Sequence, residues 1–193
     1  MTKSQKYLKR FLDIFLSIFS ILIFIIPIII LVLISTLDTG KFGVFTQDRI
    51  GRNAKIFKIF KVRTYNKIGV CTPLGKLLRK HKFDELPQLF NVLYGNMSFV
   101  GPRPDIIGYA DQLSDTDKII LNVKPGITGP ATLKFMNEQS ILENKVNPND
   151  YNLNIIWPEK VRLNKEYVKN YHIFKDIKYL IKTIFNVVKN MAF

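Results

Sequence analysis

The sequence predicts an α+β fold: an N-terminal re-entrant membrane helix, interfacial amphipathic helices and a small sheet, packed as one compact domain. Three observations predict it. An uncharged apolar run near the N-terminus is long enough for a membrane, short stretches rich in β-branched and aromatic residues follow it, and helical periodicity marks other segments. The 193 residues allow one domain of ordinary size plus an anchor. We therefore expect a membrane-inserted helix over residues 1–37 and a folded domain over residues 38–193.

The membrane segment is the apolar run Ile14–Ile34, which holds 21 residues without a charge. That length suffices for a helix to cross a hydrocarbon core of roughly 30 Å. Pro27 lies in the middle of the run. Because proline removes a backbone donor and clashes with the preceding turn, the helix is expected to kink there.

Basic residues flank the apolar run on both sides. They are Lys3, Lys6, Lys9 and Arg10 before it, and Lys41, Arg49 and Arg52 after it. Since positive flanks are typical of the cytoplasmic side, the pattern favours a hairpin that enters one leaflet, turns at Pro27 and returns. A plain kinked crossing stays open as the alternative, because spanning helices tolerate proline.

Short elements follow the anchor in order. The sequence predicts strands at Val44–Gln47 and Ile56–Val62, a helix at Leu74–Lys80 and a second helix at Asp84–Leu93 that Gly95 ends. Two Pro/Gly clusters then predict rigid turns, Gly101–Pro104 and Lys124–Pro130, separated by a polar helical stretch, Asp105–Leu121.

The C-terminal segment, about 173–191, predicts an amphipathic helix. At 100° per residue one face is apolar, and the opposite face carries lysines. The apolar face holds Ile173, Ile177, Leu180, Ile181, Ile184, Val188 and Met191, and the basic face holds Lys175, Lys178, Lys182 and Lys189. This pattern fits a helix lying in the membrane interface. It fits equally a surface helix whose apolar face packs on the folded domain.

The composition indicates acidic partners. Lys and Arg outnumber Asp and Glu by 29 to 15, giving a net charge of +14. Anionic lipid, phosphorylated substrates and nucleic acid would all satisfy that charge. We expect no nucleic acid partner, because the sequence lacks the interleaving of exposed aromatic and basic residues that would favour one. The single cysteine, Cys71, cannot form an internal disulfide, which favours a reducing compartment.

Two neighbouring carboxylates, Asp84 and Glu85, stand at the start of the second predicted helix. The angular count places Asp84, Gln88 and Asn91 within about 60° of one another, away from the Leu/Phe stripe. A helix start favours anions, so this polar face is a candidate site. On spacing alone, Asp84 could equally be an ordinary N-cap and Glu85 a first-turn partner of the helix dipole.

The stretch from Asp84 to Pro104 closely resembles the signature of the bacterial sugar transferase family, the monotopic phosphoglycosyl transferases. Other matching motifs lie in order along the chain. They are Lys9-Arg10-Phe11-Leu12-Asp13, Phe45-Thr46-Gln47-Asp48-Arg49-Ile50-Gly51, Phe57-Lys58-Ile59-Phe60-Lys61-Val62-Arg63-Thr64 and Lys124-Pro125-Gly126-Ile127-Thr128-Gly129. The resemblance covers residues 6–134 firmly and the C-terminal helix loosely.

The resemblance implies a role for four residues. It implies that Asp84 is the nucleophile, that Glu85 is catalytic and helps to hold Mg²⁺, that Arg79 binds phosphate and that Arg103 binds the nucleotide end. A carboxylate can attack a phosphoryl group whose charge a metal neutralises, and the acyl phosphate formed can be attacked by a second phosphate. Lys58, Lys61 and Arg63 are left without a role, because a solvated strand face explains them equally well.

The resemblance also implies the reaction and its setting. A phosphosugar is expected to pass from a UDP-sugar to undecaprenyl phosphate with release of UMP, through a covalent aspartyl intermediate. Residues 38–193 are then the catalytic domain, at the cytoplasmic face of the bacterial inner membrane. The expected partners are the UDP-sugar, undecaprenyl phosphate, membrane lipid and downstream glycosyltransferases of surface glycan assembly.

Some positions depart from the family pattern. Ile26 precedes Pro27 where many members have serine, Asn96 replaces an aspartate, and Pro130-Ala131-Thr132 replaces Trp-Ala-Gln, which points to a different sugar pocket. Two rivals to the expected function stay open. One is a non-catalytic membrane scaffold that binds anionic lipid, and the other is an enzyme in which the lipid phosphate attacks the donor directly.

Overall fold

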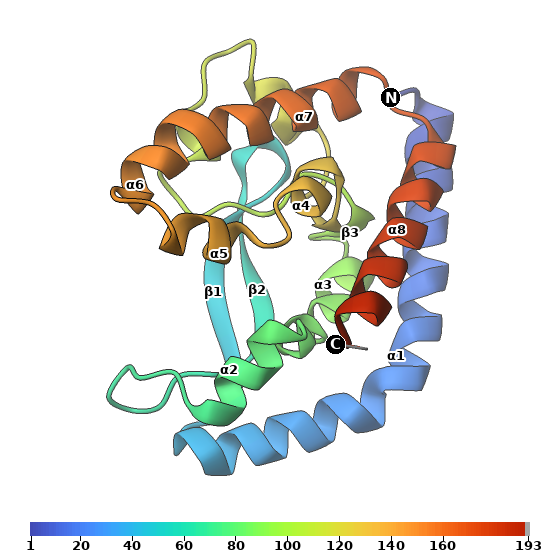
Figure 1. Ribbon diagram of the computed structural model, residues 1–193. Helices are drawn as coiled ribbons and strands as arrows, with labels where there is room; N and C mark the ends of the chain where they lie inside the picture. The colour runs from blue at the N-terminus through green and yellow to red at the C-terminus, as the bar shows by residue number, and fades with distance from the viewer. Residues whose placement is uncertain (192–193) are drawn as a thin grey trace.

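The computed structural model describes residues 1–191, and it describes every side chain among them except those of Gln139, Asn190 and Met191. The expected place of Met191 on an apolar helix face therefore lies outside the described residues. Helices and two small sheets alternate along the chain, so the α+β class is confirmed (Figure 1).

The regular elements follow one another in this order: α1 (Lys3–Thr39), β1 (Val44–Ile50), β2 (Ile56–Val62), α2 (Pro73–Lys80), α3 (Gln88–Tyr94), β3 (Ser98–Val100), β4 (Gly126–Thr128), α4 (Pro130–Lys134), α5 (Glu138–Glu143), α6 (Pro148–Tyr151), α7 (Trp157–Lys169) and α8 (Ile173–Met191). Short 3₁₀ segments lie between them, namely η1 (Arg52–Ala54), η2 (Phe83–Glu85), η3 (Ala110–Gln112) and η4 (Lys118–Asn122), and a π-helical turn, η5 (Asn152–Ile156), leads into α7.

The long helix α1 begins with a capping box and bends in its middle. The Thr2 hydroxyl accepts a hydrogen bond from the Gln5 N–H, and the Gln5 side chain accepts one from the Thr2 N–H. Gly40 ends the helix in the left-handed conformation, with φ of 66°. Figure 1 shows the helix turning sharply between its two halves, and Pro27 lies inside it. The helix is therefore bent between its two halves, as the expected kink requires.

The apolar side chains of α1 point outward. Only 11% of its most apolar stretch is buried, and within residues 1–191 no other helix is both long and apolar enough to cross a membrane. Leu22, Ile26 and Leu33 are exposed by 60% or more. Such a surface needs an apolar environment, which fits the expected membrane segment.

Buried ionic contacts attach the first half of α1 to α8 and α7. Lys9 Nζ lies 2.5 Å from Asp176 Oδ2, and both residues are more than 90% buried. The hydroxyls of Tyr167 and Tyr171 donate hydrogen bonds to the same carboxylate, at 2.7 and 3.2 Å. Lys9 is thus a structural residue, which removes one charge from the expected basic flank of the membrane segment.

Two further side chains of α1 contact the core of the molecule. Arg10 donates hydrogen bonds of 2.7 and 2.8 Å to the last-turn carbonyls of α3, where a cation complements the helix end. Asp13 Oδ1 accepts hydrogen bonds from the Ser98 hydroxyl and the Phe99 N–H of β3. The first motif of the family pattern therefore fixes α1 to the elements that carry the candidate site.

The strands β1 and β2 form an antiparallel hairpin with Val44 opposite Val62 and Ile50 opposite Ile56. Both predicted strands are confirmed, and the first extends three residues further than expected. The tight connection needs left-handed backbone at two non-glycine residues, Asn53 and Ala54, with φ of 56° and 58°.

The two Pro/Gly clusters lie against each other and hold a parallel pair, β3 and β4. The Gly101 N–H donates to the Thr128 carbonyl, and the Gly126 N–H donates to the Pro102 carbonyl, at 2.9 and 2.7 Å. A Cβ on Gly126 would come within 2.1 Å of the Gly101 nitrogen, so this approach requires glycine. The predicted turn over Lys124–Pro130 therefore holds strand β4 and the first residue of α4.

The expected helix over Asp105–Leu121 is wrong. The segment holds only the 3₁₀ turns η3 and η4. Polar side chains take backbone or local hydrogen bonds there: the Gly108 N–H donates to Asp111, and Ser114 bonds Asp117. Such local bonds compete with a continuous helix.

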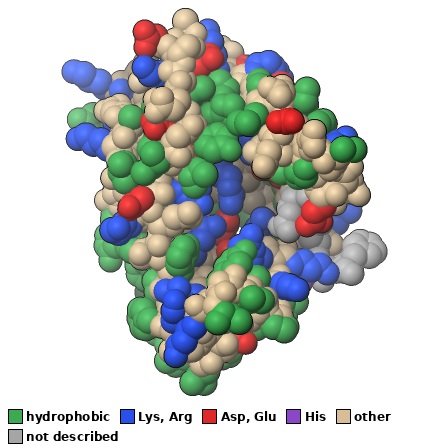
Figure 2. Space-filling view, turned by 90° about the vertical axis from the view of Figure 1, so that its left-hand side faces the viewer, with side chains coloured by type: hydrophobic (Ala, Val, Ile, Leu, Met, Phe, Trp, Pro, Cys, Tyr) green, Lys and Arg blue, Asp and Glu red, His purple; other side chains and the backbone are tan. Residues whose placement is uncertain are grey.

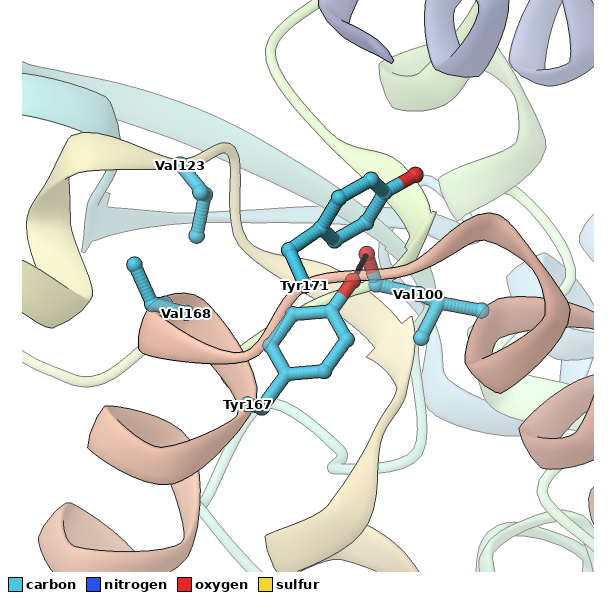
Figure 3. Close-up of a cluster of buried hydrophobic side chains, with 5 residues drawn as sticks. All are labelled: Val100, Val123, Tyr167, Val168 and Tyr171. Carbon is cyan, nitrogen blue, oxygen red and sulfur yellow. Dashed lines mark hydrogen bonds between the residues drawn. The ribbon is translucent and has the colours of Figure 1, made fainter. Parts of the chain in front are cut away.

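Two apolar clusters form the core. Figure 3 shows the first, which joins β3 to α7 through Val100, Val123, Tyr167, Val168 and Tyr171. The second joins β2 to α3 and the loop after it through Phe57, Ile59, Val92 and Met97. The hairpin is thereby fixed against α3, the helix that follows the turn carrying Asp84 and Glu85.

The C-terminal helix is confirmed as α8, which runs beside the first half of α1 in Figure 1. Its apolar stripe faces outward, with Ile177, Ile181, Ile184 and Val188 exposed by 42 to 64%. The inward side instead carries Asp176. Packing of the whole stripe on the core is therefore excluded, although Ile173 and Leu180 at its edge do contact the first cluster. No helix was predicted over Trp157–Lys169, where the structure places α7.

Removing one partner of the Lys9–Asp176 pair should destabilise the protein strongly. The variant Lys9→Met leaves Asp176 buried without its cation, which costs roughly 3–5 kcal/mol. We expect a lower melting temperature in detergent for Lys9→Met, and a partial recovery in the double variant Lys9→Met/Asp176→Leu. Additive losses in the double variant would contradict a direct interaction between the two side chains.

Candidate functional site

The two neighbouring carboxylates lie in the 3₁₀ turn η2, and α3 begins only at Gln88. The expected α-helix from Asp84 is therefore wrong in its first turn. The N–H groups of Glu85 and Leu86 bond carbonyls three residues back, at 3.1 and 3.3 Å. Pro87 has no N–H to continue an α-helical ladder through this point. The carboxylates consequently do not sit at the end of an α-helix dipole.

The expected polar face behind Asp84 is buried, and one member has a structural task. The Asn91 side chain accepts a hydrogen bond from the Phe60 N–H at 2.9 Å and donates one to the Lys58 carbonyl at 2.8 Å. Both partners lie on β2. Asn91 thus fixes the middle of β2 against α3, and this brings Lys61 beside the carboxylates.

Two cations hold Glu85. Its Oε1 lies 2.6 Å from Arg103 Nη2 and 3.1 Å from Lys61 Nζ. Lys61 Nζ also lies 4.0 Å from Asp84 Oδ2. The carboxylates of Asp84 and Glu85 are only 8% and 10% exposed. The structure therefore brings together three of the four residues expected from the sequence, Asp84, Glu85 and Arg103, and adds Lys61.

The environment separates the pKa values of the two carboxyls. Burial and the neighbouring charge of Glu85 raise the pKa of Asp84 above its ordinary value. Burial alone would raise the pKa of Glu85 too, but Arg103 and Lys61 outweigh it and hold that pKa at about 2. Neighbouring carboxyls with opposite shifts are typical of sites in which the two groups have different tasks.

Arg79 does not join this group. Its side chain is exposed, and its Nη1 donates a 3.3 Å hydrogen bond to the Tyr65 hydroxyl while the guanidinium lies over the same ring. Its charge still lowers the pKa of Asp84 to some extent. The phosphate-binding role expected for Arg79 therefore rests on the resemblance alone.

Lys61 is the site residue to which the sequence analysis gave no role. The signal lies in the alternation of β2, because Lys61 shares its face with Phe57 and Ile59, both buried. Lys58 lies on the opposite face, where it forms an exposed ion pair with Asp48. A lysine at an inward strand position indicates a buried anionic partner.

A cavity of about 1040 Å³ opens beside Glu85. One part of its wall is charged, with the cations Lys82, Arg103 and Lys160 and the carboxylates Glu85, Asp105, Glu138 and Glu143. Burial raises the pKa of Asp105 to about 6, although neighbouring cations oppose that shift. In Figure 2, Lys and Arg side chains gather in and around a hollow on the face turned to the viewer. The cations of this wall suit a phosphorylated ligand, and its carboxylates suit a divalent cation bound with that ligand.

The other part of the cavity wall is apolar and comes from the helices with exposed apolar surfaces. Phe24 of α1 and Leu180, Ile184 and Val187 of α8 line it. A single cavity therefore joins a charged wall to apolar surface that continues to the outside of the molecule. An amphiphilic ligand with an anionic head would match both parts.

The donor set beside the cavity fits Mg²⁺. Asp84 Oδ1 is buried and accepts no hydrogen bond, and Glu85 lies next to it in the chain. Across residues 1–191 no group of three or more His, Cys, Asp and Glu side chains comes together. Mg²⁺ needs fewer protein ligands than that, because one or two carboxylates are completed by substrate oxygens and water.

Comparison with known proteins gives related transferases. A sugar transferase of Bacillus subtilis, EpsL, whose function is uncharacterised, is 33% identical over 94% of this chain and 87% of its own length. The undecaprenyl-phosphate galactose phosphotransferase of Salmonella typhimurium is 31% identical over 94% of this chain and 40% of its own length.

A third relative is the UDP-glucose:undecaprenyl-phosphate glucose-1-phosphate transferase of Klebsiella pneumoniae, 35% identical over 74% of this chain and 32% of its own length. This chain thus spans less than half of the latter two relatives. The family model described as bacterial sugar transferase matches residues 4–190. The match covers almost the whole chain, and the chain belongs to the bacterial sugar transferase family.

Proposed function

We propose that the protein transfers a phosphosugar from a UDP-sugar to undecaprenyl phosphate and releases UMP. The observation that carries the proposal is the buried pair Asp84 and Glu85, held by Lys61 and Arg103 beside a cavity with a charged and an apolar wall. The proposal is supported by the name of the Klebsiella relative, which states a transfer of glucose 1-phosphate between UDP-glucose and undecaprenyl phosphate, and by that of the Salmonella relative, an undecaprenyl-phosphate galactose phosphotransferase.

In the first step, an Asp84 oxygen attacks the phosphorus nearest the sugar. A P–O bond to Asp84 forms, the P–O bond to UMP breaks, and UMP leaves with the bonding electrons. In the second step, an oxygen of undecaprenyl phosphate attacks the same phosphorus and releases the Asp84 carboxylate. The product is a sugar diphospho-undecaprenol, and two easier displacements replace one difficult one.

The chain's other residues prepare Asp84 for attack. Its Oδ1 has no hydrogen-bond partner, so the attacking atom needs no bond broken before it reacts. Glu85 stays ionised because Arg103 and Lys61 hold its pKa at about 2, and it would hold Mg²⁺. Bound Mg²⁺ neutralises charge on phosphoryl oxygens. Arg103 and Lys61 supply further positive charge near the transferred group.

The apolar wall of the cavity would receive the lipid acceptor. Phe24 and Ile184 come from the two helices whose exposed apolar surfaces suit a membrane. A polyprenyl chain entering along these helices would bring its phosphate toward Glu85 without leaving apolar surroundings. The product would then pass to downstream glycosyltransferases of a surface glycan.

We further propose that residues 1–37 form a re-entrant hairpin and that residues 38–193 are the catalytic domain at the cytoplasmic face of the inner membrane. The sharp bend of α1 supports the hairpin. The exposed stripe of α8 supports a position in the interface, because a lipid surface would cover it.

Replacing the nucleophile should abolish turnover. In Asp84→Asn the neutral amide cannot form the acyl phosphate, so we expect UMP release from UDP-glucose or UDP-galactose to fall by roughly 10³-fold or more. The fully exposed carboxylate Asp115 provides the control, and Asp115→Asn should match wild type. Equal rates for Asp84→Asn and wild type would contradict the proposal. A wild-type protein that releases no UMP from any UDP-sugar would favour the scaffold.

Two lysines of one strand should differ sharply in their effect on activity. Lys61→Met removes a cation from Asp84 and Glu85, and we expect UMP release to fall about 10²-fold, as for loss of one preorganised charge. Lys58→Met, three residues away on the solvent face, should stay within about twofold of wild type, since exposed ion pairs contribute little. Melting temperatures of both variants serve as the folding control. Similar activity losses in both would contradict the role of Lys61.

Cysteine labelling distinguishes the hairpin from a plain crossing. In a Cys71→Ser background, the exposed residues Lys3 and Lys41 are changed singly to cysteine. A membrane-impermeant maleimide should label both variants in inside-out vesicles and neither in spheroplasts. Labelling of one variant from each side would contradict the re-entrant hairpin.

A further inference from the structure

Two residues that line the cavity each carry a buried polar atom without a hydrogen-bond partner. They are Thr132 on α4, with its Oγ1, and Asn164 on α7, with its Oδ1. Asn164 is only 4% exposed, and its side-chain oxygen Oδ1 accepts no hydrogen bond from the described residues. A buried polar group left unpaired costs free energy, so such groups in a cavity wall indicate a ligand that completes them.

This pair of residues lies at one end of the charged wall. Lys160 precedes Asn164 by one helical turn on the same face of α7, and its ammonium lies 2.7 Å from the Glu138 carboxylate. Glu138, Arg103 and Glu85 line the same cavity. The residues with the unpaired amide oxygen and hydroxyl therefore share one cavity with the Glu85 site.

The chemistry of this end differs from that of the carboxylate end. Asn164 and Thr132 are neutral and offer donors and acceptors together, which suits hydroxyl or amide groups better than phosphate. The cation of Lys160 is already paired with Glu138. Phe135 and Trp157 also line the cavity and provide flat apolar surface. Neutral hydrogen-bonding groups beside aromatic faces suit a sugar ring, whose hydroxyls bond and whose C–H faces pack.

We propose that Asn164 and Thr132 bind hydroxyls of the donor sugar and determine which sugar is accepted. The inference rests on the proposed function, since it assigns a substrate group to the same cavity. Sites that hydrogen-bond a substrate hydroxyl with otherwise unpaired groups discriminate strongly against analogues that lack it or orient it differently. The unpaired amide oxygen of Asn164 thus lowers the stability of the free protein, and a hydrogen bond from the correct sugar removes that free-energy cost.

The test measures binding without turnover, in the full chain carrying Asp84→Asn. Calorimetric titration gives the Kd for UDP-glucose, UDP-galactose and UDP, with and without Asn164→Leu or Thr132→Val. We expect each second change to weaken the better-bound UDP-sugar by about tenfold and to reduce the glucose-to-galactose ratio, as for loss of a neutral hydrogen bond. The Kd of UDP, which has no sugar, should stay unchanged.

Control variants and other outcomes separate the possible errors. Asn149→Ala changes an exposed asparagine on α6 and should leave all three Kd values unchanged. Asn164→Leu should melt at a higher temperature, because it removes an unpaired buried amide. If Asn164→Leu raised the Kd of UDP and of both UDP-sugars equally, Asn164 would instead bind the nucleotide part, and the inference would be overturned. If the melting temperature fell as well, Asn164 would have a structural role, and the inference would again be overturned. Selective sugar binding by Asp84→Asn, together with a wild-type protein that releases no UMP, would support the inference while refuting the proposed reaction.

Discussion

The whole arrangement depends on the buried polar contacts between the first half of α1 and the rest of the chain. Lys9 pairs with Asp176, Arg10 bonds the end of α3, and Asp13 bonds β3. The most apolar stretch of α1 is only 11% buried, so these polar contacts, more than apolar packing, set the position of the helix on the rest of the chain. These three residues place the apolar wall of the cavity, which includes Phe24, against the segment that carries Asp84 and Glu85.

The candidate site rests on an asymmetry between two adjacent carboxyls. Glu85 has two cations within 3.1 Å, whereas Asp84 has one at 4.0 Å and an oxygen without any partner. The strongly paired carboxylate is suited to stay ionised and hold charge in place, and the weakly paired one is suited to react. The backbone achieves this with a 3₁₀ turn, which directs neighbouring side chains differently from an α-helix. Asn91 then holds β2 so that Lys61 reaches both carboxyls.

Much of the fold could be predicted from local patterns, and much of the site from the motifs. Hydrophobic runs and Pro/Gly positions located α1, both strands of the hairpin, α2 and α8, because local sequence determines these elements. Two predictions were wrong: the start of α3, where a proline interrupts the helical hydrogen bonds, and the helix over 105–121, where local polar hydrogen bonds replace it. Lys9 and Arg10 were interpreted as the basic flank of the membrane segment, and their contacts could not be predicted because their partners lie more than 80 residues away along the chain. Contacts at such sequence separation leave no periodic signal.

The most direct test of the account is the mass of the intact protein after brief exposure to a UDP-sugar and Mg²⁺ without lipid acceptor. The account predicts a species heavier by one phosphosugar, with the added mass on the peptide that contains Asp84, and its disappearance when undecaprenyl phosphate is supplied. An enzyme that turns over donor and acceptor yet never carries this added mass would contradict the covalent role of Asp84 and favour direct attack by the lipid phosphate.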